Sequence, residues 1–420
     1  MTLLITTSTM ANTKVVTKSI TRKDYEQGFI VSLVIFIVGT TLEWVTGGMG
    51  ASLPKWPANL QFGLAFIILL LFLHFYYRNT KVIKWLSRVP AASSSIVLFT
   101  ILVLILGLSK QNEPEASQFS RLTGFDHIRN SYTFLLSGLY LLTSLGLVAL
   151  RRLTPFTFKN LGFALNHVGL WIIVFAGSLG SGDLERLTIY VEEGQTVWYA
   201  YDQNREPREV PFNVKLIDFD IKDFPPKLAL IEQPGMMVPK DVKNNFTLVE
   251  SGMNYTLGEW EIAIKEYLPS ARMEGDIYVA TTDSFSVPAA FVEAAAHQGL
   301  HKVSGWLSCG NFSKEPSFMF LDNKYALAMT VPEAKEFSSL IEIRTDNQAP
   351  DTVKLRVNDP IHVGAWNLYQ LSYDEEKGKW STLSVIEAIR DPWIVIVYIG
   401  MFMVIAGAVY LFWIGRNPKN

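Results

Sequence analysis

Two histidines stand in apolar stretches where ionisable side chains are rare. His74 lies within residues 56–77 and His167 within residues 160–182, and neither stretch contains an Asp, Glu, Lys or Arg. An ionisable group at membrane depth is costly and by default marks a function. A neutral imidazole there can ligate a haem iron, relay a proton, or hydrogen-bond a neighbouring helix or the headgroups. We expect His167 to bind the iron and hold the cofactor, with His74 as a second candidate for cofactor binding.

The other histidines and the single cysteine suggest no chemistry of their own. The four remaining histidines are His127, His297, His301 and His362. His297 and His301 are four residues apart on an expected helix and would share a face, but a third metal ligand is missing and a solvated face is the preferred interpretation. Cys309 is alone, so the chain has no internal disulfide, no C-x-x-C-H motif and no dithiol pair. We expect its thiol to be buried and inert.

The apolar stretches that contain His74 and His167 belong to a set that predicts membrane-crossing helices. Stretches without Asp, Glu, Lys or Arg cover residues 28–42, 56–77, 89–109, 130–150, 160–182 and 392–415. A spanning helix needs about 20 predominantly apolar residues, and the first stretch reaches that length if Glu43 sits at the outer interface. The sequence therefore predicts a polytopic α-helical membrane protein with six transmembrane helices. Soluble enzymes and nucleic-acid-binding domains are excluded for the whole chain.

Positive charge alternates between the connecting segments. Thirteen Lys and Arg lie in residues 1–27, 78–88, 151–159 and 416–420, whereas the opposite short loops contain four. By the positive-inside rule both termini are cytoplasmic. Residues 183–391 contain 33 acidic and 20 basic residues, a net charge of −13, and fall outside. At 1.5 Å per residue, His167 is about 10 Å and His74 about 5 Å from the cytoplasmic face.

The segment between the fifth and sixth spans is expected to be β-rich. Val353, Leu355 and Val357 alternate with polar residues, which is the period of a half-buried strand. Further strands are predicted at 187–192, 212–219, 258–267, 340–344 and 366–373, and helices only at 289–301 and 331–339. We expect one sandwich-like extracytoplasmic domain of about 210 residues, large enough for a core of its own.

From about residue 93 onward the chain resembles the ResB (CcsB) family of System II cytochrome c biogenesis. The resemblance rests on Ser93–Gly107, Tyr132–Leu153, the Asn166-His167-Val-Gly-Leu segment, Leu187–Gln195, Pro211–Phe219, Val357-Asn-Asp-Pro360, Trp366-Asn-Leu-Tyr-Gln370 and Asp391-Pro392. It divides the chain into a cytoplasmic segment (1–27), two additional helices (28–88), a ResB-like three-helix membrane core (89–182), the β-rich domain (183–391), and the sixth helix with a cytoplasmic tail (392–420).

The resemblance implies a multi-pass protein of the bacterial cytoplasmic membrane with a periplasmic domain. It implies transient binding of haem b by His167 and its outward delivery to apocytochrome c. The implied partners are a CcsA-type protein carrying the tryptophan-rich WWD segment, which this chain lacks, apocytochrome c, and a thiol-reducing thioredoxin-like protein. The chain would be a subunit of a haem-lyase complex and not catalytic alone.

Two other functions fit the residues. A b-type haem subunit of a quinol-linked electron-transfer complex would need two ligands within the chain, so His74 and His167 would both be indispensable. A structural or sensory protein without a cofactor would use its external domain only to bind a partner.

Overall fold

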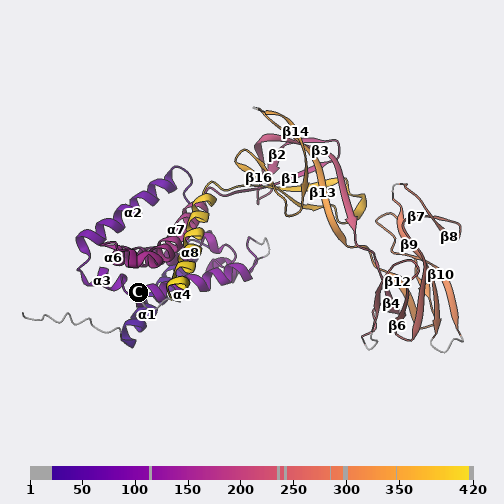
Figure 1. The fold of residues 1–420 in the computed structure, drawn as a ribbon, viewed down its shortest axis with the longest axis horizontal. Helices are drawn as coiled ribbons and strands as arrows, with labels where there is room; N and C mark the ends of the chain where they lie inside the picture. The colour runs from indigo at the N-terminus through magenta and orange to yellow at the C-terminus, as the bar shows by residue number, and fades with distance from the viewer. Residues whose placement is uncertain are drawn as a thin grey trace, which may run out of the picture. The chain divides into compact units, whose positions relative to one another are not determined.

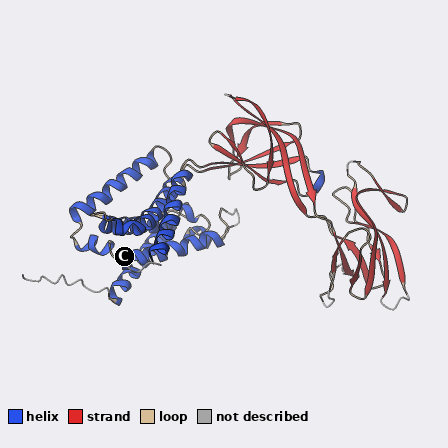
Figure 2. Ribbon diagram, viewed as in Figure 1, coloured by secondary structure: helices blue, strands red, loops and turns tan. Residues whose placement is uncertain are grey.

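A computed structural model of the protein describes residues 21–112, 116–233, 237–240, 244–283, 285–296, 301–346 and 348–415. The chain divides into two compact units, residues 1–184 with 391–420 and residues 185–390. Within the described residues, the long helices all belong to the first unit and the strands to the second (Figures 1 and 2). In chain order the β unit follows helix α7 and precedes helix α8.

Six helices in the described part of the chain are long and apolar enough to cross a membrane. They are α1 (Arg22–Val45), α2 (Ala58–Tyr77), α4 (Val89–Leu108), α6 (Tyr132–Leu153), α7 (Leu161–Gly180) and α8 (Ile394–Gly415). The six apolar stretches predict these helices to within a few residues. Shorter helices connect them: α3 (Lys81–Leu86), α5 (Gln118–Thr123), η1 (Ile128–Asn130) and η2 (Phe158–Asn160).

Small residues let the helices of this unit approach closely. A Cβ on Gly400 of α8 would lie 2.8 Å from the carbonyl oxygen of Gly169 on α7, so these two helices meet backbone to backbone. Gly28 and Gly39 of α1 similarly face Pro90 of α4 and Thr133 of α6. The first helix is therefore an integral part of the bundle.

The described residues of the β unit form two large hydrophobic cores and smaller clusters, where the sequence predicted one sandwich-like domain. The first is an eight-stranded sheet in the order β14-β13-β3-β2-β1-β17-β16-β15. Its strands are β1 (Glu185–Glu192), β2 (Thr196–Tyr201), β3 (Pro207–Asp223), β13 (Ala334–Thr345), β14 (Gln348–Arg356), β15 (Ile361–Val363), β16 (Trp366–Tyr373) and β17 (Leu383–Arg390), with η3 (Gly378–Trp380) between the last two.

The second core is inserted between β3 and β13 and lies within a five-stranded and a four-stranded sheet. The first has the order β10-β9-β7-β6, with β8 added to β7, and the second has the order β11-β12-β4-β5. The strands are β4 (Lys227–Glu232), β5 (Phe246–Leu248), β6 (Asn254–Leu257), β7 (Trp260–Glu274), β8 (Ile277–Ala280), β9 (Val287–Ala296), β10 (Lys302–Ser308), β11 (Met319–Phe320) and β12 (Tyr325–Met329).

The two helices predicted in this region were wrong. Val287–Ala296 forms β9, which pairs with β7 on one side and β10 on the other. Ala334–Thr345 forms β13, between β3 and β14. Alanine favours helices by less than about 1 kcal/mol per residue over most other residues. Ala289, Ala290 and Ala294 are instead almost completely buried in the sheet, where packing against both neighbouring strands outweighs that preference.

Candidate functional site

Helices α2 and α7 run side by side in opposite directions, and their contacts show how residues on the two helices correspond. At one end, the Asn59 side-chain amide donates to the Asp183 carboxylate over 2.7 Å. Further along, the rings of Phe66 and Phe175 stack with centroids 6.4 Å apart. The two helices are therefore antiparallel, and higher residue numbers on α2 lie at the level of lower residue numbers on α7.

The same correspondence brings His74 and His167 to one level. Leu70 of α2 and Trp171 of α7 pack in one hydrophobic cluster. His74 follows Leu70 by four residues and His167 precedes Trp171 by four, which is about one helical turn, 6 Å, in the same direction on both helices. The two predicted site residues therefore occupy corresponding positions on neighbouring helices.

The ring of His167 is oriented by Phe163, one turn earlier on α7. Its Nδ1 lies 3.1 Å from the Phe163 carbonyl oxygen, and the two rings stack with centroids 3.8 Å apart. A carbonyl oxygen only accepts hydrogen bonds, so Nδ1 carries the proton. In the neutral ring Nε2 then has a free lone pair, which is the arrangement that a metal-ligating histidine uses.

His74 is in a different environment. Only 2% of its surface is exposed, and its Nε2 has no hydrogen-bond partner among the described residues. Buried polar atoms almost always have a partner, and an exception calls for an explanation such as an absent ion, water or ligand. This unpaired nitrogen is the second polar atom that the site offers.

Arginines lie close to both histidines. The Arg152 guanidinium stacks on the Phe163 ring, 4.2 Å from its centroid. The Arg151 guanidinium donates to the Arg78 carbonyl oxygen over 2.6 Å, and Arg78 is one turn beyond His74 on α2. This end of the bundle can therefore bind carboxylates, for which guanidinium groups are well suited.

An apolar cavity of about 190 Å³ lies between α2, α6 and α7; neither histidine lines it, but Leu70 is one turn from His74 and Val168 follows His167 in the chain. It is lined by Ile67, Leu70, Leu71, Gly146, Ala149, Leu150, Val168 and Trp171. Ligand pockets usually measure about 300–1,000 Å³, so this cavity alone cannot enclose a macrocycle. A haem held by these histidines must either spread the helices or be shared with another protein.

Sequence reasoning missed a buried charged cluster built on Glu43. One Glu43 carboxylate oxygen accepts from His127 Nε2 over 2.8 Å and from Gly50 N over 2.8 Å, and the other accepts from Tyr132 N over 3.0 Å. His127 Nδ1 lies 2.5 Å from the Asp126 carboxylate. Glu43 is fully buried. Its acidity within an apolar run was the only signal, since His127 is 84 positions away.

A second cluster, around Asp183, joins three helices. Its carboxylate accepts from the side-chain nitrogens of Asn59 and Trp393 over 2.7 and 2.8 Å, and from the Trp56 backbone over 2.8 Å. Trp393 is only 8% exposed, and its indole is part of this buried cluster.

The remaining histidines stay without a shared site. His301 Nε2 lies 2.9 Å from the Leu321 carbonyl oxygen, and His362 is exposed on β15. His297 lies outside the described residues, and so does the helix face that it was expected to share with His301; the described part of that predicted helix, up to residue 296, is a strand. Within the described ranges, no group of three His, Cys, Asp or Glu residues is placed to hold a metal ion.

Comparison with known families identifies part of the β unit. Residues 272–388 match the ResB-like family. This match confirms the resemblance inferred from the sequence, and the ResB-like family suggests a role in cytochrome c biogenesis. Comparison with curated proteins finds no match.

The ResB-like segment contains the Asn358 and Gln370 motifs but does not extend to the helices with the two histidines. In the structure these motif residues have structural roles. Asn358 has a φ of +63° in the turn after β14, a conformation that asparagine tolerates better than most residues. Gln370 is buried and its side chain hydrogen-bonds to Ser339 and Ser384.

Proposed function

We propose that this protein is the membrane component of a System II cytochrome c maturation complex, in which His167 ligates haem in transit from the cytoplasmic side to the outside. The observation that carries the proposal is the His167 ring, whose Nδ1 faces a carbonyl oxygen and leaves Nε2 available. The ResB-like match in the β unit supports the same process.

The charges supply an orientation for the site. Arg78, Arg151 and Arg152 are among the basic residues that the positive-inside rule puts in the cytoplasm. Haem b made in the cytoplasm would then enter at the level of His74 and His167, with its propionates near these guanidinium groups. The β unit would face the periplasm of a bacterial cytoplasmic membrane and position the acceptor protein.

The size of the cavity argues for a shared site. Because 190 Å³ is too little for the macrocycle, a second membrane protein would supply the opposite wall of the site and a further histidine. A CcsA-type WWD protein is the partner that the resemblance implies. When bound, ferrous haem supplies the vinyl groups to which the apocytochrome cysteines add, and this chain's residues bind and orient it.

Reduction of the apocytochrome cysteines belongs to another protein. Cys309 is buried, and burial raises the pKa of its thiol to about 11. A thiol that is neither ionised nor exposed near neutral pH cannot attack a disulfide. A thioredoxin-like protein would therefore keep the apocytochrome thiols reduced.

The matched levels of His74 and His167 favour one second candidate function. If the helices part, both imidazoles of this chain could ligate one haem, as in a b-type subunit of a quinol-linked electron-transfer complex. The unpaired Nε2 of His74 is the specific observation in its favour. In that case the haem would stay bound and undergo redox cycling.

Co-expression with a CcsA-type partner and an apocytochrome tests the proposal. We expect His167→Ala to lower both co-purified haem and holocytochrome c at least tenfold, while His362→Ala, at an exposed site in the β unit, leaves both unchanged. Wild-type haem content in His167→Ala would overturn the ligand assignment. A His74→Ala complex with full haem occupancy would exclude two in-chain ligands, whereas equal loss in both variants together with reversible quinol reduction would support the b-type subunit.

A further inference from the structure

Two sheets of the second core end in neighbouring edge strands. β6 pairs only with β7 and β5 pairs only with β4 among the described strands, and residues 249–253 connect the two edges. An edge strand presents a row of N–H and C=O groups that can pair with another chain. These two edges are therefore places where a further strand could be added; β8, β10 and β11 of the same core also have one strand neighbour each among the described strands.

The hydrogen bonds show which groups of β6 remain available. Ile264 N of β7 donates to the Met253 carbonyl oxygen over 2.9 Å. Backbone groups alternate in direction along a strand, so every second residue after Met253 also faces β7. The N–H and C=O groups of Asn254 and Thr256 consequently point away from β7, toward the free edge. By the same alternation, the bond from Leu230 N to Asn245 O turns the backbone groups of Phe246 away from β4.

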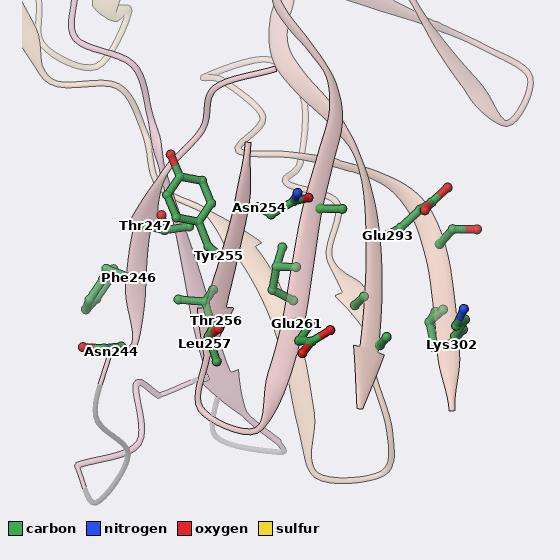
Figure 3. Close-up of a pocket in the computed structure, with 16 residues that line it drawn as sticks. Asn244, Phe246, Thr247, Asn254, Tyr255, Thr256, Leu257, Glu261, Glu293 and Lys302 are labelled. Carbon is green, nitrogen blue, oxygen red and sulfur yellow. The ribbon is translucent and has the colours of Figure 1, made fainter. Parts of the chain in front are cut away.

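A groove of about 1,090 Å³ runs along this edge and over the outer face of the five-stranded sheet (Figure 3). Its floor is low because Ala263 on β7 and Ala295 on β9 carry small side chains. Register places Ala263 between Asn254 and Glu293 in one row across the sheet. The volume is slightly above the usual range of about 300–1,000 Å³ for ligand sites, and the lining residues include parts of β5, β6, β7, β9 and β10.

Aromatic and charged residues border the groove. Phe246 on β5 and Tyr255 on β6 lie on one side and Lys302 on the other, with Glu261 and Glu293 between them (Figure 3). Glu293 is paired with Lys265 over 3.1 Å, so the negative charge of this region comes from the surrounding residues 227–330, which contain 12 acidic and 8 basic residues.

The geometry points to strand addition at β6 by an extended, basic segment of an unfolded polypeptide. A row of backbone donors and acceptors beside a shallow groove recognises a peptide main chain, as in other cases of β-augmentation. The inference rests on the proposed function for the identity of that polypeptide, which would be apocytochrome c before haem attachment. Its unfolded state leaves its own backbone groups free to pair.

Binding of a synthetic peptide to the full-length protein in nanodiscs tests this site. The probe is a 12-residue peptide that carries three lysines and a Ser-x-x-Ser-His segment, with serines replacing the cysteines, and fluorescence anisotropy reports its binding. We expect backbone N-methylation at every second residue of the bound segment to weaken binding at least tenfold, with less than twofold effects at the intervening residues. This alternation is a signature of strand pairing. Equal effects at all positions would overturn the proposal.

Matched variants at Thr256 give a second readout. Thr256→Pro removes a backbone donor at the free edge, where proline is tolerated because that N–H is not part of the β6–β7 ladder. Thr256→Ala removes the same side chain and keeps the donor. We expect tenfold weaker peptide binding for the proline variant and less than twofold for the alanine variant. Unchanged binding by Thr256→Pro would refute the pairing.

Two controls separate this inference from the proposed function. Replacing the three peptide lysines by glutamates should weaken binding at least fivefold, and equal affinity would refute the charge preference. Haem content of the complex should be normal in Thr256→Pro, since β6 is remote in the chain from both histidines. Normal haem binding without peptide binding would reject only the docking site, whereas alternating N-methyl effects without haem at His167 would reject only the proposed function.

Discussion

Replacing Glu43 by glutamine should destabilise the helical unit more than any isosteric change on its surface. The Glu43 carboxylate is fully buried and receives three hydrogen bonds, from His127 Nε2, Gly50 N and Tyr132 N. A glutamine side chain has one acceptor oxygen in place of two. At best the glutamine oxygen still accepts from His127 Nε2 and Gly50 N. The glutamine NH₂ group then faces the Tyr132 N–H, which is left without an acceptor.

The magnitude follows from these contacts. An unsatisfied buried N–H costs about 1–3 kcal/mol. For a unit of about 200 residues, a loss of about 2 kcal/mol lowers Tm by roughly 4–8 °C. Glu26→Gln is the matched control on the same helix: Glu26 pairs with Arg22 over 2.9 Å, and both side chains are exposed. Its loss should cost about 0.5 kcal/mol or less.

Thermal unfolding of the purified variants in one detergent measures both effects. A double-mutant cycle with His127→Gln adds a direct test, because coupled residues give non-additive costs. We expect the double variant to lose at least 1 kcal/mol less than the sum of the single variants. If Glu43→Gln were no less stable than Glu26→Gln, or if the two costs simply added, the charged cluster would not hold α1 against α6.

Three further predictions follow from other contacts. Gly400→Leu should lower Tm by several degrees through overpacking against α7, whereas Gly177→Leu, where a Cβ meets nothing within 4 Å, should not; equal thermal scans would contradict this. Cys309, with a pKa of about 11, should resist iodoacetamide at pH 8 until the protein unfolds, and rapid labelling of the folded protein would refute its burial. Hydrogen bonds from backbone N–H groups, chiefly that of Glu206, lower the pKa of the Asp202 carboxyl group. The ionised carboxylate stabilises that turn above about pH 4, and this stabilisation is lost as the pH falls through the lowered pKa of the folded state. Asp202→Asn should therefore make stability depend less on pH in the acid range, and an unchanged pH dependence would contradict this prediction.

Much of the fold could be predicted because its signals are local. A run of about 20 apolar residues leaves few options besides a spanning helix, and the strand at Trp366–Tyr373 was predicted to the residue. The helix predicted over the alanine-rich segment 289–296 was wrong because this segment pairs with a strand that lies elsewhere in the chain. The second core went unnoticed because β3 and β13, the strands on either side of its insertion, pair with each other although more than 100 residues separate them in the chain.

For the candidate site the sequence offers residue types and no arrangement. The depths of His74 and His167 in a membrane stay a prediction, and the antiparallel contacts of α2 and α7 place the two residues at corresponding levels of these helices. The Nδ1 bond to Phe163 and the unpaired Nε2 of His74 depend on helix packing, which no periodicity in the sequence encodes. The partnership of Glu43 and His127 was likewise invisible because the two residues are distant in the chain.

Chemical rescue of His167 tests the haem-ligand proposal most directly. The complex of His167→Gly with its CcsA-type partner should lack the absorption bands of six-coordinate haem, and millimolar imidazole should restore them because it can occupy the space of the lost ring. Full bands in His167→Gly without imidazole would contradict the account. So would an absence of haem bands in the wild-type complex.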